Sequence, residues 1–122
     1  MSTLNVSNIS DGTTTVGTSY VVNGSAKAWV IHNSSTVIKD SHNVSSITDT
    51  ATGRTAVNFN SSFSTTTYAV SVCSMRGSTA AASQFEDNGV SKTASVCNSV
   101  YRSSSALADT NQGSVICMGA LA

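Results

Sequence analysis

Residues 26–59 read AKAWVIHNSSTVIKDSHNVSSITDTATGRTAVNF, and this stretch decides the fold. Aromatic and β-branched residues alternate along it with polar residues, and a turn at Gly53 interrupts the alternation. That pattern is typical of half-buried strands in an antiparallel sheet. In the strand expected at residues 26–32, Trp29 and Ile31 face one way, whereas Ala28, Val30 and His32 face the other. Because both faces are partly apolar, this strand is predicted to be central in its sheet.

The strand pattern continues to the end of the chain. Val, Ile and Thr are plentiful, no helical stripe is present, and Gly, Asn, Ser and Thr supply the turns in a chain without proline. Strands are predicted at residues 19–22, 26–32, 37–39, 44–48, 55–59, 67–75, 80–85, 92–102 and 114–121. A spacing of about 8–12 residues favours an all-β fold, a compact antiparallel β-sandwich or jelly-roll-like domain. This domain is assigned to residues 24–122.

The same stretch resembles a recurring segment of bacteriophage tail-fibre and related virion structural proteins, especially those of marine phages and cyanophages. The resemblance lies in the AKAW run from Ala26, the NVSSITD run from Asn43 and the VNF run from Val57. His32 and His42 depart from it, because the family usually carries Phe there. The resemblance implies a non-enzymatic virion protein, made in the host bacterial cytoplasm, that forms a homotrimer and contacts a host-surface glycan or protein.

Residues 1–23 are predicted to form an N-terminal attachment arm. Leu4, Val6 and Ile9 are the apolar points of its otherwise polar opening, which resembles the start of many short marine-phage structural proteins. Such a segment can add a strand to the edge of a partner's sheet. A disordered tail and a first strand of the sandwich are the alternatives. The expected partner of the arm is another virion protein, in the tail or in the capsid.

The composition excludes several kinds of partner. Only 10% of the residues are charged, six Lys and Arg balance six Asp and Glu, and roughly a third of the chain is Ser or Thr. A chain without a basic field has no electrostatic source for binding nucleic acid or anionic lipid. No run approaches the roughly 18 apolar residues of a membrane helix, and the N-terminus has no signal-peptide pattern.

Individual residues give few signals of chemistry. Trp29 is expected in the core, with a sugar-stacking platform as the alternative. Cys73, Cys97 and Cys117 are expected as small buried hydrophobes, although two of them could form a disulfide if they face each other. His32 and His42 are expected to pack like aromatic residues or to lie exposed, with a metal on a trimer axis as a weaker alternative. No catalytic, cofactor or calcium-loop motif is present.

The candidate receptor contacts lie in four loops rich in neutral hydrogen-bonding groups, with Phe85 or Tyr101 as a possible stacking face. They are Asn60, Ser61, Phe63, Ser78, Thr79, Glu86, Asp87, Asn88, Ser104, Asp109 and Asn111. Three functions follow in order of preference. The first is a tail-fibre-type host-attachment domain, the second a capsid decoration or cement protein, and the third, with no plausible acid pair, a glycan-degrading enzyme.

Overall fold

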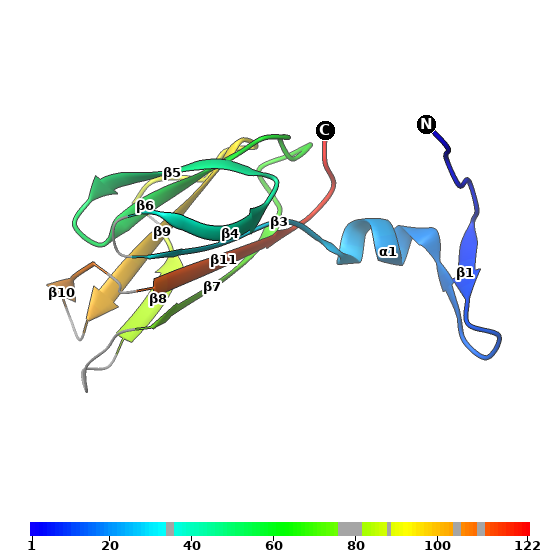
Figure 1. The fold of residues 1–122 in the computed structure, drawn as a ribbon, viewed down its shortest axis with the longest axis horizontal. Helices are drawn as coiled ribbons and strands as arrows, with labels where there is room; N and C mark the ends of the chain where they lie inside the picture. The colour runs from blue at the N-terminus through cyan, green and yellow to red at the C-terminus, as the bar shows by residue number, and fades with distance from the viewer. Residues whose placement is uncertain (34–35, 76–81, 88, 104–105, 110–111) are drawn as a thin grey trace.

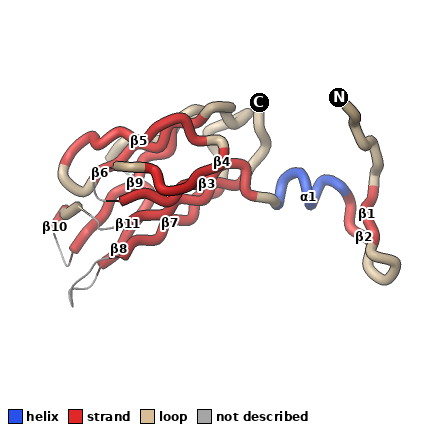
Figure 2. Tube along the Cα trace, viewed as in Figure 1, coloured by secondary structure: helices blue, strands red, loops and turns tan. Residues whose placement is uncertain are grey.

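The structure is a computed structural model that describes residues 1–122 apart from 34–35, 76–81, 88, 104–105 and 110–111. It consists of strands with one short helix (Figures 1 and 2). The elements are β1 (Asn8–Ser10), β2 (Thr15–Gly17), α1 (Thr18–Gly24), β3 (Ala26–Asn33), β4 (Ile38–His42), β5 (Val44–Ala51), β6 (Arg54–Phe59), β7 (Ala69–Met75), β8 (Ala82–Glu86), β9 (Val96–Ser103), β10 (Ala106–Leu107) and β11 (Gln112–Met118).

Two antiparallel sheets pack face to face and confirm the predicted β-sandwich (Figure 1). One sheet has the order β4-β3-β11-β7, and the other has the order β10-β9-β6-β5, with β8 also paired to β9. The core between them holds alternate residues of each sheet, among them Val30, Val57, Cys97, Val115 and Cys117. The sequence therefore predicted the architecture correctly, because the period-two alternation marks which side chains are buried.

Strand β3 is central, between β4 and β11, as predicted. Ala28, Val30 and His32 are buried, whereas Trp29 and Ile31 are only half-buried on the opposite face. The expectation that Trp29 anchors the core is therefore wrong. Trp29 alternates along β3 with the buried residues Ala28 and Val30, so its side chain lies on the outer face of the sheet. No second layer of the described chain covers that face.

His32 occupies the core position that its strand parity predicts. Its Nδ1 donates a hydrogen bond to the backbone oxygen of Asn33 at 2.9 Å, and its Nε2 has no partner among the described residues. Gly113 lies opposite His32 in β11, and a Cβ added there would come within 2.5 Å of Nε2. The imidazole therefore fills the space that a side chain at residue 113 would need. The other histidine, His42, is exposed.

Three aromatic rings close one end of the sandwich. The Phe63 ring stacks on Tyr68 with centroids 4.2 Å apart, and both rings meet Phe59 edge to face. The single proton of the Tyr68 hydroxyl is shared between two backbone oxygens, those of Thr93 at 3.0 Å and Val96 at 2.9 Å. Burial raises the pKa of Tyr68 well above its ordinary value of 10.0, so this hydroxyl stays protonated and remains a donor.

The turn between β5 and β6 lies at the opposite end of the sandwich and contains Gly53, as predicted (Figure 1). Gly53 has φ +69, and a Cβ there would come within 2.7 Å of the Tyr101 backbone oxygen. The Gly53 oxygen accepts a hydrogen bond from the Tyr101 amide at 2.7 Å, and its amide donates to Asp109 Oδ1 at 2.8 Å. Only glycine meets both the backbone angle and the close approach.

Four elements differ from the prediction, and two of them are the arm strands β1 and β2, where no strand was predicted. The segment predicted as a strand at 19–22 is part of helix α1, and the loop predicted after residue 103 contains the short strand β10. A strand needs a neighbour to satisfy its backbone, whereas a helix satisfies most of its own hydrogen bonds. Because this segment lies outside the sandwich, the helix is the conformation that leaves fewer groups unpaired. Asn23 and Gly24 end the helix.

Candidate attachment arm and polar pocket

The N-terminal arm extends away from the sandwich, which begins at β3 (Figure 1). It consists of the β1–β2 hairpin followed by α1, and no residue of α1 is buried. The arm joins the sandwich at the end where the chain also terminates. At that end, Leu121 bridges to Phe63 and the Ala122 amide donates to the Ser62 oxygen.

The hairpin of the arm is set by a short acidic turn. Asp11 Oδ1 accepts hydrogen bonds from the amides of Thr14 at 2.8 Å and Thr13 at 2.9 Å. These bonds stabilise the carboxylate and lower the pKa of Asp11 below its ordinary value of 3.8, with the Thr14 amide as the larger cause. Beyond the hairpin, the Thr18 amide donates to the Ser7 oxygen and fixes the start of the helix.

Apolar side chains of the arm are exposed to solvent. Leu4 is 82% exposed and Tyr20 is 76% exposed, and the remaining members of the group are Met1, Val6, Ile9, Val16, Val21 and Val22. Single exposed apolar residues are ordinary, but eight of them within one short protruding segment are not. Leu4, Val6 and Ile9 are thus available for the predicted attachment, which remains a prediction. Val16 and the helical residues were not predicted as attachment residues, and a strand at 19–22 would have placed only alternate side chains on one face.

A polar pocket of about 460 Å³ lies on the sandwich beside the end of β8. Its lining residues are Thr66, Glu86, Asp87, Ser91 and Lys92. Lys92 Nζ forms an ion pair with Glu86 Oε1 at 2.8 Å and lies 5.0 Å from the centre of the Tyr68 ring. The volume falls within the range of small-molecule sites, and the lining offers hydroxyl, carboxylate and ammonium groups to a ligand.

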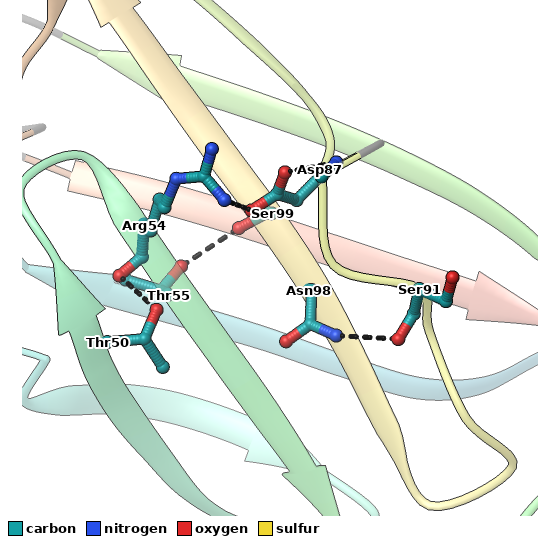
Figure 3. A network of polar contacts seen from close by, with 8 residues as sticks. Thr50, Arg54, Thr55, Asp87, Ser91, Asn98 and Ser99 are labelled. Atoms are coloured by element: carbon teal, nitrogen blue, oxygen red, sulfur yellow. Dashed lines mark hydrogen bonds and ion pairs between the residues drawn. The ribbon is translucent and has the colours of Figure 1, made fainter.

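A partly buried hydrogen-bond network holds the wall of this pocket (Figure 3). Asp87 Oδ2 accepts a 2.7 Å hydrogen bond from Arg54, and its Oδ1 accepts one from the Gly89 amide at 2.8 Å. Next to it, the Asn98 amide group donates to the Ser91 oxygen at 3.1 Å. Since Asp87 is buried and both of its oxygens are engaged, its carboxylate positions the loop after β8 and is not a free ligand-binding group.

The predicted receptor-contact residues do not converge on one surface. Asn60 and Ser61 lie near the end that carries the arm, where the Asn43 side chain bonds the Ser61 backbone. Asp109 lies at the opposite end and holds the Gly53 amide. Of the predicted residues that the structure describes, only Glu86 and Asp87 line the pocket. Ser78, Thr79, Asn88, Ser104 and Asn111 lie outside the described residues.

Two aromatic expectations need correction. Phe63 is 2% exposed and belongs to the core, so its ring cannot contact a receptor in this conformation. Tyr101 is likewise buried, so it offers no stacking face. Phe63 follows the polar residues 60–62, which suggested exposure, whereas Tyr101 lies within β9 and its backbone contacts the Gly53 turn. The backbone of Phe85 is described as part of β8, but the exposure of its side chain is not.

Lys92, Ser91 and Thr66 were missed as pocket residues. No local signal marks them, because they come from loops that only the fold brings beside β8. Arg54 and Asp87, 33 residues apart, illustrate the same difficulty for the wall of the pocket. Within the described part of the chain, no three His, Cys, Asp or Glu side chains group closely enough to hold a metal ion.

The comparisons add no assignment. Among the described residues, no helix has the length and apolar character required to cross a bilayer. No family model matches the chain, and neither the curated proteins nor the solved structures contain a significant match to it.

Proposed function

We propose that this chain is a non-enzymatic structural protein of a bacteriophage virion, with a tail-fibre-type domain that mediates attachment to the host surface. The observation that carries the proposal is the protruding arm with its eight exposed apolar side chains. Apolar area in such a position gains free energy when a partner covers it, at roughly 25 cal/mol per Å². The arm would hold the sandwich to another virion protein, and the sequence resemblance supports the same role.

The sandwich would then provide the host contact. Its surface has few charges, and the pocket beside β8 offers Glu86, Lys92, Ser91 and Thr66 to a ligand. Carboxylate and hydroxyl groups accept hydrogen bonds from sugar hydroxyls, and the ammonium group donates to sugar oxygens. A saccharide is therefore the ligand class that suits the pocket. In the resembling family the domain would work as a homotrimer, which light scattering would detect as three times the chain mass of 12.4 kDa.

The role of the arm can be tested by comparing two double variants. One introduces two Asp residues at apolar positions of the arm, and the other introduces two Asp residues at neighbouring polar positions. In a Leu4→Asp, Val6→Asp double variant, a partner would have to bury two carboxylates. The matched control is Asn5→Asp, Ser7→Asp, which adds the same charge but keeps the apolar residues. We expect incorporation into assembled phage particles, quantified by mass spectrometry, to fall at least tenfold for the first variant only.

Two outcomes would contradict the proposal at different levels. If the wild-type chain is absent from purified particles, it is not a virion protein. If both double variants are incorporated equally, the apolar residues of the arm do not mediate attachment. Host contact is tested separately by competition, because excess purified protein should slow adsorption of the phage. Glu86→Gln should weaken this competition, whereas Asp49→Asn, an exposed acid on β5, should not.

The same arm also suits a capsid decoration or cement protein. In that case the arm would bind the capsid lattice, and the sandwich would bury area against neighbouring subunits. The number of copies per particle separates the two functions. Hundreds of copies would favour decoration, whereas a handful would favour a fibre.

A further inference from the structure

Cys97 and Cys117 face each other across the interior of the sandwich. Cys97 lies in β9 of one sheet, and Cys117 lies in β11 of the other. Their exposed fractions are 0% and 1%, and both belong to the core cluster. The third cysteine, Cys73, is exposed on the outward side of β7. The fold therefore selects one of the three possible pairs.

The two buried thiols are in direct contact. They share a side-chain hydrogen bond, which, together with burial, raises the pKa of the Cys117 thiol. A raised pKa keeps this thiol protonated and slows its attack on an external disulfide. Because the pair is also inaccessible to solvent in the closed sandwich, an oxidant reaches it during folding or when the sandwich opens.

We propose that Cys97 and Cys117 form a disulfide that links the two sheets. The oxidant class is a small disulfide, such as oxidised glutathione. The thiolate of one cysteine attacks the glutathione disulfide and releases one reduced glutathione. The second thiolate then displaces the other glutathione and forms the Sγ–Sγ bond, so two electrons and two protons leave the protein and two reduced glutathione molecules are produced.

This bond would close the chain segment from residue 97 to residue 117. A loop of that length, roughly 20 residues, limits the unfolded chain enough to raise Tm by about 10 °C in a domain of this size. Antibody domains contain an inter-sheet disulfide of the same kind, which shows that facing strands of a sandwich can be bridged. The bridge would form only outside a reducing compartment.

The experiment uses the full chain with Cys73→Ser, which removes the exposed thiol and leaves the pair. The protein is unfolded in urea and refolded in a glutathione redox buffer, so both thiols are accessible before the sandwich closes. We expect a protein about 2 Da lighter than the reduced form. A proteolytic map should link the peptides that contain Cys97 and Cys117, and the Tm should fall by about 10 °C on addition of dithiothreitol.

The control is Cys73→Ser with Cys117→Ala, which replaces one buried thiol by a small apolar side chain. This variant should lack the mass change, and its Tm should not respond to dithiothreitol. The proposal is overturned if natively refolded Cys73→Ser protein, checked by circular dichroism, retains two free thiols in the oxidising buffer. It is also overturned if the disulfide-linked protein has the same Tm as the reduced protein, because the bond would then not stabilise the folded sandwich.

Discussion

Replacing Phe63 with alanine tests the assignment of this residue to the core. The ring is 2% exposed and touches the rings of Phe59 and Tyr68. Removing a buried ring costs about 2–3 kcal/mol in transfer free energy, and the cavity and lost aromatic contacts bring the usual total to about 3–5 kcal/mol. We therefore expect the free energy of unfolding to fall by about 4 kcal/mol. That is a large part of the roughly 5–15 kcal/mol available to a domain.

The assay is urea denaturation followed by circular dichroism and by the fluorescence of Trp29, the single tryptophan. Tyr20→Ala is the matched control, since it also removes an aromatic ring, but one that is 76% exposed on α1. The control should change the free energy of unfolding by no more than about 0.5 kcal/mol. A loss below about 1 kcal/mol for Phe63→Ala would refute the reasoning, because a ring packed between two others cannot be removed so cheaply.

Three further changes address other parts of the molecule. Gly113→Ala should destabilise the sandwich by about 1–3 kcal/mol in urea denaturation, because the added Cβ meets the buried His32 ring, and an unchanged midpoint would contradict this packing. Tyr68→Phe should cost about 1–2 kcal/mol in the same assay, since the part-buried hydroxyl contacts with the Thr93 and Val96 backbone oxygens are lost and, within the described chain, only the Val96 oxygen keeps another donor, the Thr93 amide. The lowered pKa of Asp11 means that its contribution to the hairpin is present above pH 3.8 and is lost as the pH falls through the folded value. The amide resonance of Thr14 in an NMR titration should therefore shift on acidification in the wild-type chain but not in Asp11→Ala.

The periodic part of the fold could be predicted from the sequence. In β3 and β7 the alternation identifies the inward residues, such as Val30 and Val72, since neighbouring side chains point to opposite faces. The same rule gave the inward position of His32. The alternation does not say, however, which face of the strand the second sheet covers. Trp29 was predicted in the core only because its side chain is large and apolar.

The residues that close the ends of the sandwich could not be predicted in the same way. Phe63 is a single apolar residue in a polar loop, and its burial depends on Tyr68 and on the bridge to Leu121 near the end of the chain. Asp87 looked like an exposed turn residue because its partner Arg54 lies on another strand. Contacts of this kind are set by tertiary packing, and no local pattern marks them.

The arm and the carboxyl terminus leave the sandwich at the same end, while the turn at Gly53 lies at the other end. If the arm anchors the protein as proposed, the Gly53 turn would lie at the end of the sandwich away from the anchoring point. Peptides or labels introduced there would project outward, provided that Gly53 itself is retained, since its backbone fits only glycine. A tag fused to the last residue would instead lie next to the arm and would compete for space with whatever the arm binds.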